Sequence, residues 1–141
     1  MIREATADDM GALIAMARSF DATSQYGEWD GFNGTAVQGM LEAMLADDDS
    51  AIFVTDDLSA AIGFTVAPSL KSNAQMRIER FWWCDPAKRG NGMRLYHKAD
   101  AWARERGAEI HSLVSPAKDL DVAALYRRLG YVPVETVWVK Q

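Results

Sequence analysis

A glycine-containing turn between an apolar run and a helical pattern constrains this chain more than any other feature. The run 81–84 (FWWC) predicts a buried strand, residues 85–94 read DPAKRGNGMR, and residues 95–106 predict a helix that ends at Gly107. Glycine lets a backbone approach a ligand closely. The unpaired amides and the dipole of a first helical turn favour an anion. The sequence therefore predicts a phosphate site at this turn.

The two most familiar nucleotide motifs do not fit the turn. The dinucleotide fingerprint needs a third glycine three residues after the second, and Leu95 occupies that position. The ATP/GTP loop needs a Gly-Lys-Ser/Thr triplet, which does not occur in the chain.

The turn resembles the pyrophosphate loop of the GNAT (Gcn5-related N-acetyltransferase) superfamily, Gln/Arg-x-x-Gly-x-Gly/Ala, which holds the diphosphate of acetyl-CoA. The residues that match in order are Arg89, Gly90, Asn91, Gly92 and Met93. Arg94 departs from the pattern, because a small residue is usual there. Two readings of Arg94 stay open: it caps the phosphates directly, or it crowds the loop.

A second motif extends the resemblance. Residues 123–131 (AALYRRLGY) resemble the superfamily signature in which a tyrosine, often the general acid, precedes a glycine and an aromatic residue. The resemblance covers the C-terminal half from Gln75 onward, whereas the N-terminal half matches only in the order of its elements. Within the superfamily the chain resembles small phage-encoded members.

The resemblance implies a single GNAT-like domain over residues 1–141. Its fold is mixed α/β, with one mostly antiparallel central sheet flanked by helices in the order β-α-α-β-β-β-α-β-α-β. It also implies acetyl-CoA as co-substrate and direct transfer of the acetyl group to an amine.

Hydrophobic periodicity predicts the same order of elements. The predicted strands are 3–6, 51–55, 60–67, 75–84, 109–114 and 131–139; the predicted helices follow residues 9 and 34 and cover 95–106 and 120–129. The three strands between 51 and 84 are joined by short turns, which indicates an antiparallel meander.

Composition narrows the class of protein. The chain has 141 residues, 49% of them hydrophobic, as in one globular domain with a real core. It begins without the apolar run of a signal peptide, its longest uncharged segment (58–70) is too short to span a membrane, and its one cysteine cannot form an internal disulfide. We expect a cytoplasmic protein, in the host cytoplasm if it is phage-encoded. The two histidines and one cysteine lack metal-site spacing, so no metal is expected.

Charge is divided unevenly along the chain. Residues 1–70 hold two basic and twelve acidic side chains, a net of −10, whereas residues 71–141 hold thirteen basic and eight acidic ones, a net of +5. The total of −5 disfavours nucleic acid as a partner. The basic half carries the glycine turn and suits the polyanion CoA, although basic residues also favour helix C-termini for structural reasons.

Acetyl transfer to an amine needs a base for the amine and a proton for the leaving thiolate. Tyr126 is the candidate acid, because a phenol stays protonated at neutral pH; the alternative is a packing tyrosine in the helix. Glu79 is the candidate base, on the strand that leads to the turn. Its alternative is a surface ion pair with Arg77 or Arg80, and a strand bulge there would leave its direction open.

The resemblance implies further contacts to acetyl-CoA at the end of that strand, where backbone groups of Trp83 and Cys84 hold the pantetheine arm. We interpret the Cys84 side chain as a small core residue rather than a nucleophile.

The loop 20–34 is expected to bind the acceptor. Its candidate residues are Tyr26, Glu28, Trp29 and Asp30. Carboxylates attract an ammonium and aromatic rings hold its body, which predicts a cationic primary amine, either a small molecule or a protein group. The alternative is an ordinary acidic surface loop.

Two rival functions and one assembly stay open at this stage. One rival is a GNAT-like CoA-binding or protein-interaction module without catalysis, and the other is a transferase acting on nucleic acid. A homodimer is consistent with the resemblance, and no membrane partner is expected.

Overall fold

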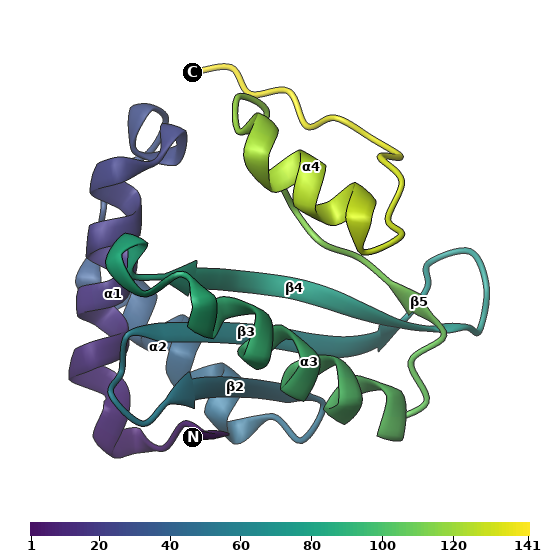
Figure 1. Ribbon diagram of the computed structural model, residues 1–141, viewed down its shortest axis with the longest axis horizontal. Coiled ribbons are helices and arrows are strands. Elements are labelled where there is room, and N and C mark those ends of the chain that lie inside the picture. The colour runs from purple at the N-terminus through teal and green to yellow at the C-terminus, as the bar shows by residue number, and fades with distance from the viewer.

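Three antiparallel strands joined by short turns form the centre of the sheet, as the meander pattern predicts. In the computed structural model, which describes residues 1–141, these are β2 (Ser50–Thr55), β3 (Ala60–Pro68) and β4 (Gln75–Cys84). A short β1 (Ile2–Glu4) pairs antiparallel with β2, and β5 (Ile110–His111) pairs parallel with β4. The strand order is β1-β2-β3-β4-β5 (Figure 1).

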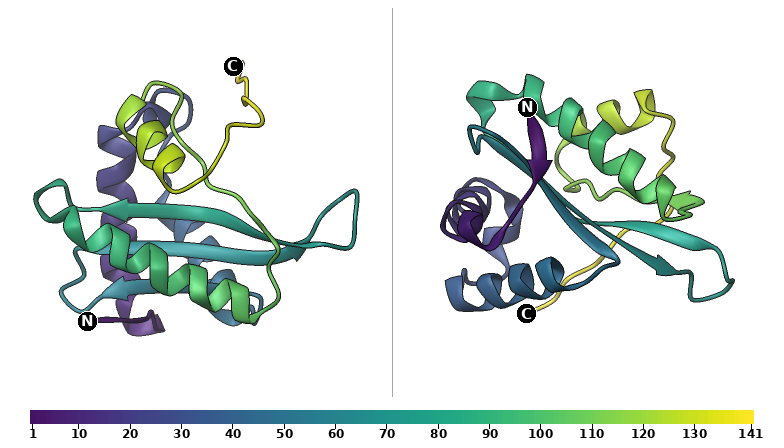
Figure 2. Two further views of the ribbon diagram at one scale, coloured as in Figure 1. Left: turned by 45° about the vertical axis from the view of Figure 1, so that its right-hand side comes forward. Right: turned by 90° about the horizontal axis from the view of Figure 1, so that it is seen from below.

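Helices cover both faces of the sheet. The helices α1 (Met10–Thr23) and α2 (Gly34–Ala46) lie on one face, and α3 (Gly90–Glu105) lies on the other, together with α4 (Leu120–Arg128) (Figure 2). Short 3₁₀ turns cover 7–9, 25–28 and 86–88. None of the helices combines the length and the apolar character needed to cross a membrane.

Two apolar layers hold these elements together. Ile52 and Val54 of β2 face α1 and α2, whereas Phe53 between them packs toward Leu95 and Ala99 of α3. Successive strand residues point to opposite faces. Because both faces are covered, β2 and β3 are almost continuously buried and do not alternate between apolar and polar residues.

A β-bulge interrupts β4 at Arg80. Gly63 of β3 pairs with Phe81, but the next residue, Phe64, pairs with Glu79, so Arg80 is the extra residue. Gly63 is required there, because a Cβ atom would lie 2.5 Å from the Phe81 ring. A bulge changes the direction of the side chains that follow it, and it leaves Glu79 beside the open edge of β4.

That edge is open because β4 and β5 diverge almost at once. Their register covers only Met76 and Arg77 of β4, and the last bond is the one from the Ser112 amide to the Arg77 carbonyl, at 2.9 Å. Beyond Arg77 the outer edge of β4 has no partner strand, and the segment 112–116 leads away from it to α4 (Figure 1).

The structure corrects three expectations. The predicted strand 131–139 does not form: its residues have no regular structure, and Val134 and Trp138 are 86% and 89% exposed. An apolar pattern shows that a segment suits a sheet. No strand of the sheet pairs with residues 131–139, however, and Pro133 has no amide hydrogen to donate. The strand expected over 109–114 is reduced to two residues, and α1 extends to Thr23, into the expected loop.

Candidate active site

A cavity of about 560 Å³ lies where α1, α2, β4 and α4 meet, beside the open edge of β4. Sixteen of its twenty-one lining residues are hydrophobic. Glu79, Tyr26 and Tyr126, all expected to be functional, line it together. The fold thus brings together the candidate base, the candidate acid and one candidate acceptor residue.

Glu79 is half-buried at this wall, and its carboxylate accepts a hydrogen bond from the backbone amide of Val114. Burial raises the pKa of Glu79 to about 7, against the lowering effects of that hydrogen bond and of nearby Arg77. Neither Arg77 nor Arg80 forms an ion pair with it, because Arg77 pairs with Asp100 and Arg80 has no ion-pair partner. The alternative of a surface ion pair is therefore wrong.

Tyr126 of α4 also contacts Val114, the residue whose amide binds Glu79. Its hydroxyl donates to the carbonyl oxygen of Val114 at 2.9 Å. Its ring lies parallel to that of Trp82, with centroids 6.2 Å apart, and Trp82 stacks in turn on Tyr96 of α3. Burial raises the pKa of Tyr126 above its ordinary value, with the nearby Glu79 carboxylate adding to the effect, so the phenol stays protonated.

Val114 is a residue of the candidate site that sequence reasoning missed. One residue receives the carboxylate of Glu79 at its N–H group and the hydroxyl of Tyr126 at its C=O group. Both contacts are made by the backbone, so the identity of the side chain carries no signal that could have revealed them.

The acceptor loop is only partly placed at the cavity. Tyr26 lines it and packs against the Phe20 ring, with centroids 5.8 Å apart. Gly27 makes this possible, because a Cβ atom there would lie 2.5 Å from the Asp21 carbonyl oxygen. The structure does not bring the other three candidates to the cavity lining. These are Glu28, which borders a separate open hollow, and the exposed Trp29 and Asp30.

The glycine turn becomes the start of α3. Gly90 is the first residue of the helix and is exposed, with open space where a side chain would begin. Gly92 is buried, and a Cβ atom there would lie 3.6 Å from Nε1 of Trp82 and 3.7 Å from Cβ of Cys84. Gly90 therefore leaves the first turn open to a ligand, whereas Gly92 faces β4, where the space admits a Cβ atom but no larger side chain.

Some of the other side chains of the glycine turn have partners within the protein, and others are exposed and unpaired. Asn91 donates to the Ser59 hydroxyl at 3.3 Å, and Met93 packs into the core. Lys88 is paired with Asp57 at 2.8 Å. Arg89 and Arg94 form no ion pair and are exposed.

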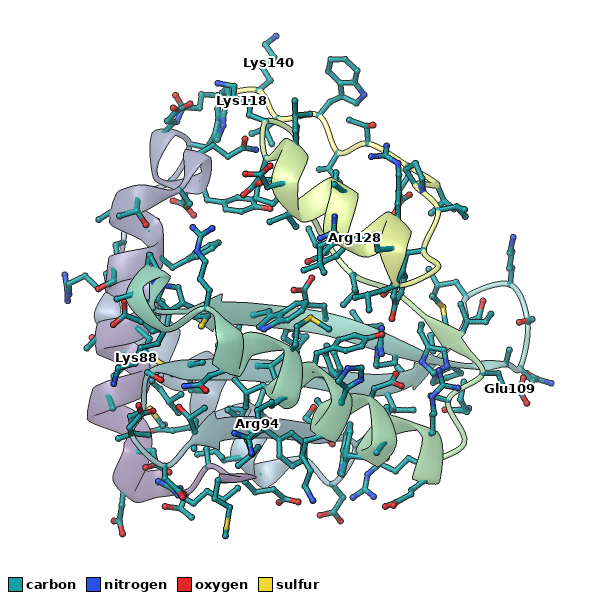
Figure 3. The ribbon with its side chains drawn as sticks, in the orientation of Figure 1. Lys88, Arg94, Glu109, Lys118, Arg128 and Lys140 are labelled. Carbon is teal, nitrogen blue, oxygen red and sulfur yellow. The ribbon has the colours of Figure 1, made fainter.

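Arg94 lies on the far side of the helix from the open edge. Two residues after Gly92 correspond to a rotation of about 200° around a helix, and Figure 3 shows Arg94 on the side of α3 that faces away from α4. The larger side chain therefore does not crowd the first turn against β4.

Trp83 and Cys84 end β4 with their side chains on opposite faces. Trp83 packs in the layer under α1 and α2 and lines the cavity. Cys84 faces α3, where its thiol donates to the Lys88 carbonyl at 3.2 Å, and burial raises its pKa. A thiol that is protonated at neutral pH is a poor nucleophile, which agrees with a packing role for its side chain.

Arg77 holds the segment that follows α4 from within the core. It is fully buried, forms an ion pair with Asp100 of α3 and donates to the hydroxyl of Tyr131. Its guanidinium lies 4.5 Å from the centre of the Phe64 ring. Because an arginine in a strand is usually exposed, its residue type alone does not reveal this role.

Comparisons with known proteins were made by sequence and by structure. No family model and no curated protein matches the sequence. In contrast, a variant of the BH1408 protein from Bacillus halodurans matches the structure with a TM-score of 0.84 at 14% identity, over 100% of this chain and 98% of that one.

Two enzymes are similar as well. Aminoglycoside 6'-N-acetyltransferase AAC(6')-IG from Acinetobacter haemolyticus matches with a TM-score of 0.73 at 13% identity, over 100% of this chain and 97% of that one. AAC(6')-Iy, solved with a CoA-containing bisubstrate analogue, matches with a TM-score of 0.77 at 14% identity, over 100% and 96%.

The chain has the GNAT acetyltransferase fold. The fold class implied by the two motifs is thereby confirmed, apart from its last strand. At identities of 13–14% the likeness establishes the fold, so the reaction has to be argued from the residues of this GNAT fold.

Proposed function

We propose that this protein transfers an acetyl group from acetyl-CoA to a primary amine by direct attack. The arrangement of Glu79 and Tyr126 on the backbone of Val114, at the wall of an apolar cavity, supports the proposal most strongly. A carboxyl group with a pKa of about 7 and a protonated phenol lie at one site, and this supports roles for them as base and acid in general acid–base catalysis.

The residues around the start of α3 fit the polyanionic donor. Gly90 leaves the first turn unobstructed, and Arg89 is an unpaired cation beside it. The first amides of a helix have no acceptor within the helix and favour phosphate oxygens. The unpaired outer edge of β4 supplies further backbone N–H and C=O groups, which suit the amide-bearing pantetheine arm. Acetyl-CoA supplies the activated thioester.

Glu79 removes a proton from the bound ammonium, directly or through one water, and leaves a neutral amine. The amine nitrogen attacks the thioester carbonyl carbon, a C–N bond forms, and the C–S bond breaks with its electron pair on sulfur. Tyr126 donates its hydroxyl proton to that sulfur, which leaves as the CoA thiol, and the proton that the attacking nitrogen loses returns to the tyrosine oxygen through solvent. To do so, the hydroxyl must exchange the Val114 carbonyl for the leaving group.

Calorimetric titration with acetyl-CoA tests the donor site. Gly90→Asp places a carboxylate in the first turn, where it favours the helix itself but repels phosphate. Arg89→Ala removes the unpaired cation. Lys71→Ala, in the exposed turn between β3 and β4, removes the same charge elsewhere. We expect both loop variants to weaken binding about tenfold or more and the control to bind as wild type does.

Two results would overturn the proposal in different ways. If folded wild-type protein does not bind acetyl-CoA, the loop is not a CoA site. If it binds acetyl-CoA but no amine releases CoA thiol, the chain is a CoA-binding module without transferase activity, which is the rival function.

A further inference from the structure

The cavity beside Glu79 has a chemical character that the acceptor loop alone did not suggest. Its walls come from the facing sides of α1, α2 and β4. They include Met16, Phe20, Val37, Met40, Phe81 and Trp83. Its volume of about 560 Å³ lies within the range of about 300–1,000 Å³ that is typical of small-molecule sites.

The charged groups of the lining are few and mostly engaged or peripheral. Arg80 is exposed, and Asp21 also borders the open hollow next to the cavity, which places both at the rim. Asp119 caps α4 by accepting from the Val122 amide at 3.0 Å. Glu79 is therefore the one carboxylate on the apolar wall that is free of such a structural role beyond its bond to Val114.

We infer that the acceptor is a small primary amine on an apolar body, aromatic or branched aliphatic, whose ammonium lies at Glu79 while the body fills the cavity. This inference rests on the proposed function for its reaction. It differs in two ways from the expectation for the loop 20–34. The acceptor carries a single ammonium group, and it contacts Tyr26 but neither Glu28 nor Asp30.

Desolvation disfavours the more polar amines. A second ammonium or the hydroxyl groups of an amino sugar would lie against apolar walls, where unpaired polar groups are costly to bury. A protein lysine would bring one ammonium, but its four-methylene stem would leave most of the cavity unfilled and its lining without contacts.

A matched panel of amines tests the inference by two separate measurements. Direct binding of 2-phenylethylamine, putrescine and glucosamine is measured at pH 8 by calorimetry, without acetyl-CoA. Release of CoA thiol is then measured for the same amines and for a lysine peptide with acetyl-CoA present. We expect 2-phenylethylamine to exceed each other amine in kcat/KM by about tenfold or more, since the burial of its ring is the main difference.

Side-chain variants connect the preference to the cavity. Phe20→Ala and Tyr26→Ala should each raise the KM for 2-phenylethylamine about tenfold and leave the KM for acetyl-CoA unchanged. Both residues are half-buried or partly exposed, so the fold should survive. Leu70→Ala is the control, because it removes an equally apolar side chain that is fully exposed in the turn between β3 and β4.

Each outcome has a distinct meaning. Preference for putrescine, glucosamine or the peptide would overturn the inference and leave the acetyltransferase proposal intact. If 2-phenylethylamine binds but no amine causes release of CoA thiol, the transferase proposal is overturned. The inference that the cavity binds an amine with an apolar body would still be supported. If none of the amines binds or reacts while acetyl-CoA still binds, the inference fails and the donor site stands.

Discussion

Glu79 combines two properties that conflict in an ordinary surface glutamate. It accepts a hydrogen bond, which favours the charged form, yet burial dominates and raises its pKa to about 7. A base of this strength is partly ionised at neutral pH and still able to take a proton from an ammonium.

We predict that the pH profile of kcat/KM for the amine rises through about pH 7 as Glu79 ionises. Glu79→Gln should lower kcat about a hundredfold or more and remove that limb of the profile. Steady-state kinetics from pH 5.5 to 9 measures both. A Glu79→Gln enzyme with the wild-type profile would assign the base to another group.

The same shift has a consequence for stability. The unfolded chain releases the Glu79 proton near pH 4.5 and the folded chain near pH 7, so the folded state loses stability as pH rises through this window. Glu79→Gln lacks this loss. We expect its Tm to exceed that of wild type by about 3 °C at pH 8 and to equal it near pH 4.5, allowing for partial exposure. Calorimetric melting of both proteins at the two pH values tests this prediction. A difference in Tm that does not change with pH would refute the buried-charge explanation.

Tyr126 has a structural role and a proposed chemical role, and one substitution can separate the two. Tyr126→Phe keeps the stack on Trp82 and removes the bond to Val114. We predict a loss of about 1 kcal/mol in the free energy of unfolding. If the hydroxyl donates to the leaving sulfur, kcat should also fall about a hundredfold with little change in the KM for acetyl-CoA. Loss of stability with unchanged kcat would leave Tyr126 a packing role alone.

At the scale of elements, the start of α3 shows that its two glycines have different roles. A Cβ atom at Gly92 would lie in ordinary contact with Trp82 and Cys84, at 3.6 and 3.7 Å. Alanine favours a helix over glycine by about 0.5–1 kcal/mol. We therefore predict that Gly92→Ala is neutral or slightly stabilising, whereas Gly92→Asp buries a carboxylate and costs about 2 kcal/mol or more. Urea unfolding of both variants tests this, and a strongly destabilised Gly92→Ala would contradict the packing described here.

Sequence predicted the elements better than it predicted their pairing. The meander β2–β3–β4, the helix after the glycine turn and α4 follow from local periodicity and turn residues, because local chemistry determines them. The bulge at Arg80 and the divergence of β4 from β5 depend on contacts between distant segments. The same holds for the site: Glu79 and Tyr126 are visible in the sequence, but their meeting at a backbone group of Val114 is not.

At the scale of the whole molecule, the C-terminal segment after α4 stands apart from the two packed layers. Tyr131 is held by Arg77 and by Tyr96, whose hydroxyl lies 2.7 Å from its own. Beyond it, no backbone amide donates a hydrogen bond to another backbone group. The exposed side chains there include Val134 and Trp138, which suit a covered surface better than an open one.

We predict that the amides of residues 132–141 exchange with solvent without protection in dilute solution, while those of β3 are strongly protected. Hydrogen exchange measured by mass spectrometry compares the two segments directly. Repeating it at high protein concentration tests the homodimer: protection that appears only there would show that a second copy covers the segment. Protection at every dilution would contradict the exposed segment described here.

The stack of Tyr96, Trp82 and Tyr126 also makes the protein its own optical probe. The Trp82 indole lies between two phenol rings, at centroid distances of 5.6 and 6.2 Å, and joins α3 to α4. Indole emission depends on what packs against the ring, so the emission of Trp82 reports whether this stack is intact. A molecule that separates α3 from α4 would break the stack and change that emission. Subtracting the spectrum of Trp82→Phe isolates that signal from the other four tryptophans, and ligand entry can then be followed in real time without a label.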